Sequence, residues 1–433
     1  MTTSTLPFDQ DYIRQLASEN NEPVWMTEFR LQALAQAENL PLPKPDKTKI
    51  DKWDFVGKGR VETKQEPVRS LEELPEDVKK LINVEANKNV LVQRSNTEAF
   101  VALSEEAKEK GVLFTDIVTA AREHSDLVQK YLMKDGVKVD EHRLTALHAA
   151  LINGGAFVYV PKNVVLETPL QAVYVIDSEE VNVYNHVLVV ADANSAFTYV
   201  ENYVADEMTT GIANIVTEVI VEQGAQVKFG AVDLLAKGIT GYVNRRGVVG
   251  RDGRLEWALG LMNDGNTIYE NVTNLMGDGS YADTKTVTIG RGEQTQNFTT
   301  KVVHFGKHSQ GNILKHGVQK DSATAIFNGI GKIEHGASKS DAQQTSRVLM
   351  LNDKARGDAN PILLIDEDDV MAGHAASVGR VDPMQLYYLM SRGISKTEAE
   401  RLVIHGFLAP VVNELPIEGV KTQLTEVIER KVR

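Results

Sequence analysis

Cysteine is absent from the 433-residue sequence. Its absence excludes disulfide bonds, zinc ribbons, thiol nucleophiles and all-cysteine iron–sulfur sites built from this chain alone. Any metal held by the chain must therefore be bound by histidine, carboxylate or backbone oxygen atoms. The sequence contains 10 histidines, so the number of candidate nitrogen ligands is small.

The sequence also lacks a long apolar run and an excess of basic charge. No stretch approaches the roughly 18 apolar residues of a transmembrane helix, and the N-terminus has neither the basic start nor the apolar segment of a signal peptide. The formal net charge is −13, which would repel nucleic acids and anionic lipids. We therefore expect a cytoplasmic protein with no nucleic-acid and no membrane partner.

The residue pattern divides the chain into three regions. Residues 1–152 have mostly helical spacing, with helices predicted over 114–134 and 142–152. Short strands are predicted over 90–92 and 99–103, and residues 46–55 are interpreted as an ordered polar arm. Residues 153–366 form short alternating runs rich in Val, Ile, Thr, Tyr and Phe, which are typical of strands. Residues 367–433 return to helical periodicity. The pattern predicts a mainly β core between two helical regions.

A weak repeat runs through the β region. Small residues followed by alternating residues recur at Ser195, Gly224, Gly253, Gly279 and Ser322, with spacings of 29, 29, 26 and 43 residues. The first three spacings are close to one period, and the last is about one and a half. Such a repeat indicates the coils of a β-solenoid with small residues at the corners. An antiparallel sandwich or barrel remains the alternative, because it also gives short strands and regular turns.

The C-terminal region carries clear helix boundaries. Asp382 is the predicted N-cap of a helix that starts at Pro383. A capping box is predicted at Ser395 and Glu398, in a helix that ends before Gly406. A last helix is expected from about Glu418. Terminal helices have a physical purpose here, because a solenoid needs its ends covered.

The search for catalytic motifs is negative. The sequence has no phosphate-binding loop, no His-Glu-x-x-His and no Gly-x-Ser-x-Gly. The histidines at 304, 308, 316 and 335 are interpreted as polar corners of strands rather than a metal cluster. The acidic run 366–369 is interpreted as a solvated turn. The small-residue segment 371–380 holds His374, which is either a residue of a tight packed turn or a ligand.

Longer segments resemble a known family. Residues 369–382, 386–394 and 399–407 are similar to the C-terminal signature of the SufB/SufD family of iron–sulfur cluster assembly scaffolds. Residues 22–30 and 44–53 are similar to the SufD branch of that family. The resemblance covers essentially the whole chain. It implies a right-handed parallel β-helix flanked by helical N-terminal and C-terminal regions.

The resemblance also implies partners and a site. Family members pair through their β-helices, so the expected partners are a SufB paralogue and the ABC-type ATPase SufC. Whether the chain alone forms a homodimer through the same surface is left open by the sequence. The lack of cysteine excludes the sulfur-accepting role of SufB. His374 matches the family histidine that faces a transient Fe–S cluster at the SufB–SufD interface. No cofactor is expected on the isolated chain, and a flavin in the complex is compatible with the resemblance.

The segment 383–407 matches the family's ATPase-docking helices. An ion pair between Arg380 and Asp382 is expected at the joint between the β-helix and these helices. The residues expected to dock the ATPase are Pro383, Leu386, Tyr387, Tyr388, Leu389, Arg392 and Gly393.

Two other functions stay open at this level. A polysaccharide-degrading β-solenoid would need paired carboxylates on one face, and Asp233, Asp252 and Asp283 do not fall at coil spacing. A structural adaptor without a metal role is the second alternative. A non-catalytic scaffold is the function that the sequence favours.

Overall fold

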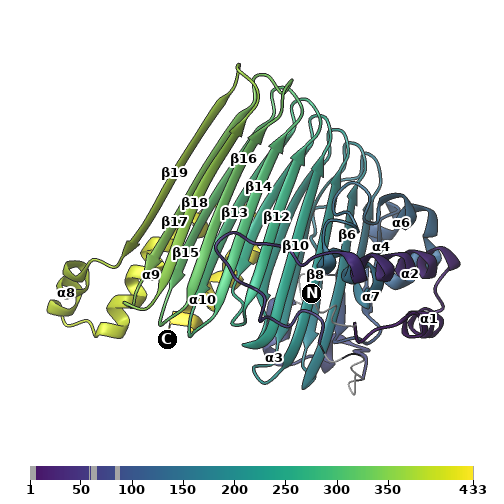
Figure 1. Ribbon diagram of the computed structural model, residues 1–433, viewed down its shortest axis with the longest axis horizontal. Helices are drawn as coiled ribbons and strands as arrows, with labels where there is room; N and C mark the ends of the chain where they lie inside the picture. Colours follow the sequence, from purple (N-terminus) through teal and green to yellow (C-terminus); the bar gives the residue numbers. More distant parts are fainter. Residues whose placement is uncertain (1–5, 58, 60–65, 83–87, 433) are drawn as a thin grey trace.

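A computed structural model describes residues 6–57, 59, 66–82 and 88–432. Its centre is a parallel β-solenoid formed by two stacked sheets, with helices at both ends of the chain (Figure 1). The predicted fold class is therefore confirmed. None of the helices in this described part combines the length and the apolarity that crossing a bilayer requires.

Sheet A has ten strands. Its strands pair in parallel except for the first two, β2 and β1, which are antiparallel. In spatial order they are β2 (Phe100–Ala102), β1 (Val90–Arg94), β5 (Leu170–Ile176), β7 (Ala196–Ala205), β9 (Gln226–Leu234), β11 (Arg254–Leu261), β13 (Tyr281–Gly290), β15 (Gln310–Gln319), β17 (Asp341–Met350) and β19 (Met371–Arg380).

Sheet B has nine strands and lies against sheet A. Its first two strands, β3 and β4, are antiparallel, and the rest are parallel. In spatial order they are β3 (Leu113–Asp116), β4 (Gly154–Val160), β6 (Glu180–Ala191), β8 (Thr210–Val221), β10 (Gly238–Val249), β12 (Thr267–Leu275), β14 (Thr295–His304), β16 (Thr324–Ile333) and β18 (Arg356–Ile365).

The sequence repeat corresponds to the coils. Ser195, Gly224, Gly253 and Gly279 each lie just before a strand of sheet A, so their spacing is one coil. Ser322 lies just before β16 of sheet B, and the spacing of 43 is therefore one and a half coils. Residues with a left-handed backbone conformation (positive φ), such as Asn194 and Gly224, form several of these corners. The small residue that follows each of them is buried, which lets successive corners stack.

The solenoid interior is apolar over most of its length. Side chains at alternate positions point inward, so the same position in successive coils stacks into a ladder. Tyr199, Phe229 and Trp257 form one ladder, with ring centroids 5.4 and 4.7 Å apart. At about 25 cal/mol per Å² of buried apolar area, such ladders are the main source of stability for the coils.

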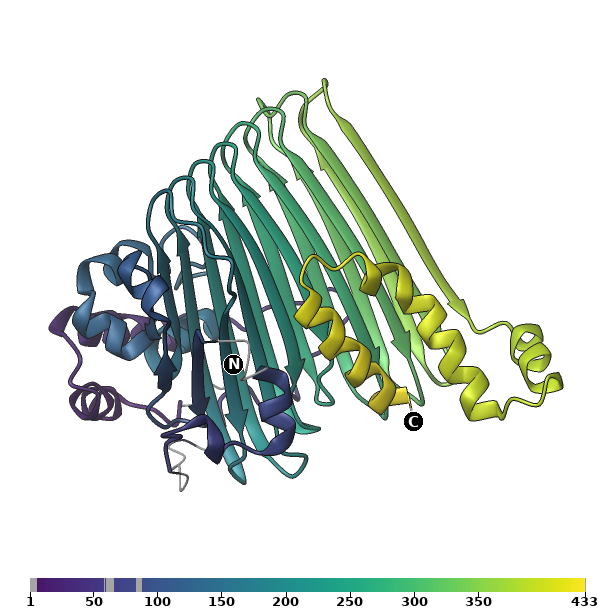
Figure 2. The same cartoon turned by 180° about the vertical axis from the view of Figure 1, so that it is seen from behind.

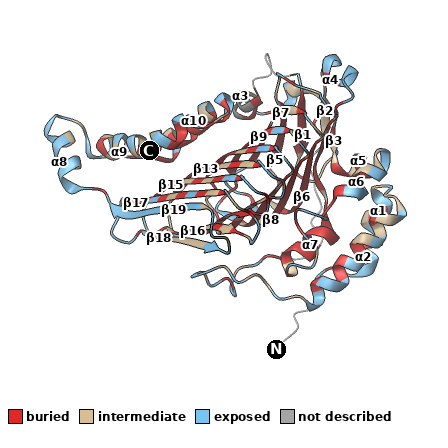
Figure 3. Ribbon diagram, turned by 90° about the horizontal axis from the view of Figure 1, so that it is seen from above, coloured by how far each residue is buried: buried red, intermediate tan, exposed pale blue. Residues whose placement is uncertain are grey.

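Most of the N-terminal helices cover the outer face of sheet B at its first coils, whereas the helix Glu76–Ile82 packs on β1 and β5 of sheet A (Figure 3). The predicted helix over 114–134 is wrong in its first part, because 113–116 form β3. The β-branched and aromatic residues of that strand pair with β4 instead. The helical elements are α1 (Gln10–Glu19), α2 (Val24–Asn39), a 3₁₀ turn (Leu71–Glu73), α3 (Glu76–Ile82), α4 (Glu105–Glu109), α5 (Ile117–Glu123), α6 (Ser125–Tyr131) and α7 (Arg143–Leu151).

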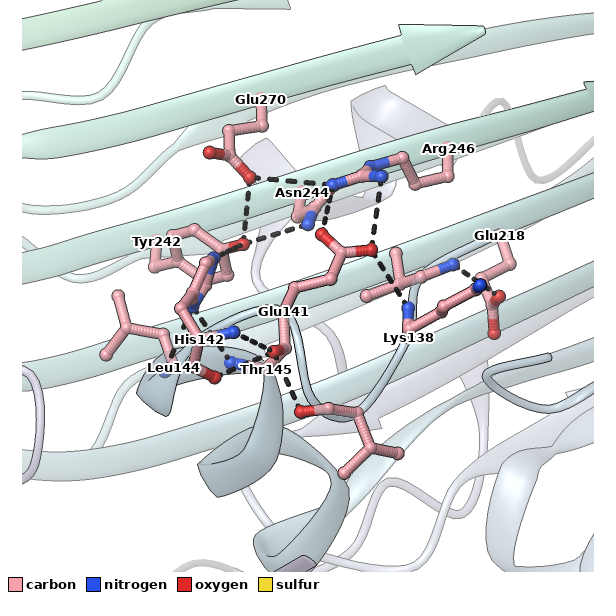
Figure 4. Close-up of polar contacts among 12 residues, drawn as sticks. Lys138, Glu141, His142, Leu144, Thr145, Glu218, Tyr242, Asn244, Arg246 and Glu270 are labelled. Atoms are coloured by element: carbon pink, nitrogen blue, oxygen red, sulfur yellow. Dashed lines mark hydrogen bonds and ion pairs between the residues drawn. The ribbon is translucent and has the colours of Figure 1, made fainter. Parts of the chain in front are cut away.

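A polar network fastens the start of α7 to sheet B (Figure 4). His142 caps the helix, and its Nδ1 accepts the N–H of Leu144 at 3.2 Å. Its Nε2 then carries the proton and donates to the hydroxyl of Tyr242 at 3.1 Å. The Tyr242 hydroxyl in turn donates to Glu270 at 3.0 Å. Burial lowers the pKa of His142, so this neutral, tautomer-defined arrangement is the stable one.

The N-terminal segment that is similar to the SufD branch has a structural role. Arg30 is fully buried and donates two hydrogen bonds to Glu22, at 2.8 and 2.6 Å. The same guanidinium also donates to the carbonyl oxygens of Ala150 and Ile152, at the end of α7. A buried charge with its full set of partners fixes the angle between α2 and α7.

The polar arm is ordered, as predicted. It crosses the outer face of sheet B toward the C-terminal coils (Figure 1). Asn297 on β14 donates to the carbonyl of Asp46 at 2.8 Å and to the hydroxyl of Thr48 at 2.7 Å. Lys47 reaches Asp358 and Asn360 on β18. The arm therefore ties the N-terminal helices to the far edge of sheet B.

The C-terminal helices are α8 (Pro383–Ser391), α9 (Lys396–Asn413) and α10 (Glu418–Val432). The last two lie on the outer face of sheet A, where their apolar sides pack on β9 to β15 (Figure 2). The predicted end before Gly406 is wrong, because packing on the sheet carries α9 through that glycine. Ser395 caps α9, but Glu398 binds Arg401 instead of closing the capping box.

The sheets extend beyond the predicted core of 153–366 at both ends. Strands β1 to β3 lie inside the mainly helical region 1–152. Strands β1 and β2 match the short strands predicted over 90–92 and 99–103, whereas β3 was not predicted. Strand β19 lies inside the predicted docking region 367–433. Its small residues gave no strand pattern, and it is held by parallel pairing with β17.

Candidate functional site

His374 lies on β19, the last strand of sheet A. The segment 371–380 is therefore an edge strand and not the tight packed turn that was one interpretation of it. His374 pairs in register with Gln344 of β17, whose side chain is buried in the solenoid interior. Because no further coil covers it, the His374 side chain is exposed on the continuation of that interior face. An imidazole in this position is accessible to a metal or to another chain.

The solenoid ends on two uncovered edge strands. Strands β18 and β19 each have ten residues and pair on one side only. At the opposite end, the edges are the short antiparallel strands β2 and β3, which limit pairing with another chain. The C-terminal edges carry exposed apolar side chains at 38–63% exposure, namely Leu364, Ile365, Met371 and Val378. A long exposed edge with apolar side chains is a surface on which another chain can pair.

The predicted docking segment projects from this end. Asp382 accepts the N–H of Met384 at 2.9 Å, which confirms the N-cap and places Pro383 at the first helical position. No residue of α8 is buried (Figure 3). Leu386 and Leu389 are half-buried. The exposed members of the predicted set are Pro383, Tyr387, Tyr388, Arg392 and Gly393.

The expected ion pair between Arg380 and Asp382 is not formed. Arg380 instead binds the carboxylate of Asp353 at 2.5 Å. The strand ends at Arg380, so its side chain points along the sheet, while the Asp382 carboxylate is engaged by the helix N-terminus. The joint between β19 and α8 is therefore fixed by a helix cap and not by that ion pair.

The histidines at 304, 316 and 335 do not gather. His304 is buried at a corner, where its Nδ1 lies 2.8 Å from the hydroxyl of Ser309. His335 is exposed beside Glu367, and His316 faces the carbonyl of Phe407. No group of three or more His, Asp or Glu side chains within the described ranges is arranged to hold a metal. The acidic run 366–369 is an exposed turn, as predicted.

A buried charged cluster lies inside the solenoid. Arg245 donates to Glu201 at 2.8 Å and to Asp233 at 2.8 and 3.0 Å, and all three side chains are at most 2% exposed. Two carboxylates share one guanidinium, which leaves one excess negative charge. Burial, together with the nearby Asp233, raises the pKa of Glu201 to about 7.

A second buried charge lies closer to His374. Lys315 on β15 is 1% exposed, and its amine donates to the carbonyl of Asn328 at 2.8 Å. The in-register neighbours Thr286 and Ser346 are uncharged. Burial alone lowers the pKa of Lys315 to about 7. A lysine with this environment stays largely neutral above that pH.

Replacing Lys315 with methionine is expected to stabilise the chain. In the folded state the Lys315 pKa is lowered, so the unfolded chain binds more protons between pH 7 and about 10. Stability of the wild type therefore rises with pH in that window. We expect Lys315→Met to gain on the order of 1–4 kcal/mol at pH 7 and less at pH 9, measured by urea unfolding. A variant less stable than the wild type at both pH values would contradict this prediction.

The carboxylates considered for polysaccharide cleavage are not paired on a face. Asp233 is buried against Arg245, and Asp283 forms an ion pair with Lys285. Asp252 is a corner residue with a left-handed backbone. These three carboxylates therefore do not form the acid and base pair of a glycoside hydrolase among themselves.

Comparison with known proteins agrees with this geometry. Residues 174–407 match the family model of the SUF system FeS cluster assembly SufBD core domain, and residues 80–172 match that of the SufBD protein N-terminal region. The core match alone covers more than half of the chain. The chain belongs to the SufBD family.

Two relatives illustrate the range of the SufBD family. The chain is 66% identical, over the full length of both proteins, to the iron–sulfur cluster assembly protein SufD of Bacillus subtilis. It is 30% identical to an iron–sulfur cluster assembly SufBD family protein of Staphylococcus saprophyticus, over 94% of this chain and 90% of the relative. The resemblance to the SufD branch is therefore confirmed.

At this end of the SufBD solenoid, Arg347 and Ser377 were not singled out from the sequence. His316 was interpreted as a polar corner, but it lies inside strand β15. Arg347, Ser377 and His316 lie in register on three neighbouring strands beside α9. Their sequence spacing of 31 and 30 residues is close to one coil, so the repeat itself was the available signal. It was missed because the repeat was followed only through small residues.

Proposed function

We propose that this chain is a non-catalytic scaffold subunit of an iron–sulfur cluster assembly complex. In that complex, the β18 and β19 edges pair with a cysteine-bearing SufB paralogue. The helices α8 and α9 dock the SufC ATPase. The nascent cluster is cargo, held between the two scaffolds with His374 as the ligand from this chain.

The uncovered edge is the observation that carries the proposal. Two ten-residue strands end the solenoid with unpaired backbone groups, and His374 lies on one of them. A chain that pairs along these strands would continue the interior face of sheet A and place its own side chains beside His374. Because this chain has no thiolate, the sulfur ligands must come from the partner.

Imidazole suits this cargo. Histidine replaces cysteine as an iron ligand in some clusters and raises their reduction potential. When the ligands come from two chains, a movement of the chains can separate them and release the cluster. Such an arrangement is consistent with a scaffold that builds a cluster and passes it on.

The exposed helix supports the ATPase partner. Exposed aromatic side chains such as Tyr387 and Tyr388, on a helix with no buried residue, are typical of protein interfaces. The chain has no phosphate-binding loop of its own, so nucleotide hydrolysis would belong to the partner.

Assembly tests the proposal directly. The tagged chain is co-expressed with the SufB paralogue and the ATPase, and the purified complex is weighed by native mass spectrometry. We expect one paralogue and two ATPase copies for each copy of this chain. A chain that is recovered without ATPase would contradict the docking role.

A surface variant separates the two interfaces. The double change Tyr387→Ser and Tyr388→Ser is expected to weaken ATPase capture by at least about tenfold and to leave the paralogue bound, because exposed tyrosines often dominate an interface. Phe305→Ser is the control, since Phe305 is also exposed but lies on a distant corner. Equal ATPase capture by both variants would exclude α8 as the docking helix.

A further inference from the structure

A row of three side chains crosses the outer face of sheet A beside α9. His316 on β15, Arg347 on β17 and Ser377 on β19 are in register. The row runs from the strand beneath α9 to the strand that carries His374. Ser377 is three residues from His374 on β19.

Phe407 of α9 contacts the first two members of this row. Its carbonyl oxygen lies 2.9 Å from Nδ1 of His316, and because a carbonyl only accepts, Nδ1 donates. The two rings stack with centroids 5.0 Å apart. The guanidinium of Arg347 lies over the Phe407 ring, 5.7 Å from its centroid. Phe407 is therefore held between a neutral ring and a cation.

Arg347 extends the contact to the edge strand. Its Nε donates to the hydroxyl of Ser377 at 3.3 Å. Strand β19 pairs with β17 alone, so no strand holds it on its other side. A side chain that bonds to β19 and also covers an α9 ring links the two elements physically.

We propose that Arg347 is a positioning residue that couples the C-terminal helices to the strand that carries His374. When an ATPase bound to α8 and α9 displaces Phe407, the guanidinium of Arg347 loses its contact with the Phe407 ring. Its hydrogen bond to Ser377 then changes as well. Strand β19 then changes its position, and His374 moves with it. The role in cluster assembly rests on the proposed function, whereas the mechanical coupling does not.

The apolar contacts of α9 explain why a motion of this helix would reach the sheet through Phe407. The part of α9 that packs on β13 and β15 is anchored by buried residues such as Leu408 and Val411. Phe407 is only half-buried and lies where the sheet approaches its open edge. Burial lowers the pKa of His316, so its ring stays neutral, and Arg347 is the only cation of this row. A movement of the Phe407 ring therefore changes the position of Arg347.

Hydrogen–deuterium exchange on the full chain alone tests the coupling. Phe407→Leu keeps an apolar residue on α9 but removes the ring. We expect the amides of 371–380 to exchange about three- to tenfold faster, while those of 281–290 are unchanged. Arg347→Ala is expected to give the same increase, and adding Phe407→Leu to it is expected to add nothing. Additive increases, or no increase in either variant, would overturn the proposal.

A conservative variant excludes a general loss of structure. Arg347→Lys keeps a cation over the ring and a donor for Ser377. We expect its exchange pattern to stay within about twofold of the wild type, and the melting temperatures of all variants to agree. An Arg347→Lys variant that behaves like Arg347→Ala would contradict a role based on these two contacts.

The assembled complex tests the role in the reaction. With Arg347→Ala we expect ATPase capture and ATP hydrolysis to be retained and cluster loading to fall about three- to tenfold, with rescue by Arg347→Lys. Normal loading by Arg347→Ala would overturn the regulatory role. If the wild-type complex loads no cluster, the proposed function fails, and the exchange measurement on the chain alone still decides the coupling.

Discussion

Replacing His374 with alanine is expected to lower cluster loading of the assembled complex by at least about tenfold while the complex stays intact. His374 is exposed at the end of the solenoid, so its removal leaves no cavity and should change stability by less than about 0.5 kcal/mol. Its imidazole is the ligand that the proposed function assigns to this chain at the uncovered edge. Visible absorption and iron content of the purified complex measure the effect.

Two further variants make the His374 test specific. His335→Ala removes a histidine that is 92% exposed on a nearby corner, and it should load normally. His374→Cys restores an iron ligand of a different type and should recover part of the loading. Full loading by His374→Ala would show that the chain is a structural adaptor without a metal role.

Replacing Arg245 with methionine is expected to destabilise the chain by about 3–5 kcal/mol at pH 8, because it leaves two buried carboxylates without a partner. Without the guanidinium, burial would raise the pKa of Glu201 in the folded state further above its value in the unfolded chain. A raised folded pKa gives stability that is lost as the pH increases. The loss of stability caused by Arg245→Met should therefore be smaller at pH 5 than at pH 8. The midpoint of urea unfolding at each pH measures it.

Arg254→Ala provides the control for Arg245→Met. Arg254 lies on the neighbouring sheet with its guanidinium over the exposed side of Tyr281, 4.0 Å from the ring centroid. Its removal should cost about 1 kcal/mol or less and show no such pH dependence. An Arg245→Met variant as stable as the wild type at pH 8 would show that the buried cluster is not required for folding.

The solenoid was largely predictable because its coils repeat. Several corners have a residue with a left-handed backbone followed by a small buried residue, and this local pattern is visible in the sequence as Asn194-Ser195 or Gly224-Ala225. The helix caps at Asp382 and Ser395 were found for the same reason, since the interactions are local. Corners and helix caps depend on residues that are close in the sequence, so the sequence alone predicts them.

The errors share a physical cause. Strand β19 was not recognised because Ala and Gly have no strand preference of their own, and the strand exists only through pairing with β17. The end of α9 was placed too early because Gly406 breaks an isolated helix, whereas packing on sheet A holds this one. In both places tertiary contacts outweigh local propensity.

The sequence by itself determined the class of fold, the coil period, the absence of thiolate chemistry and the family. These follow from composition, from corners that repeat and from a long motif, all of which are properties of neighbouring residues. Only the tertiary structure decided that His374 lies on an uncovered edge strand, that Arg245 and Lys315 are buried charges, and that Arg347 joins α9 to β19. These contacts connect residues tens of positions apart, and their formation depends on how the coils stack.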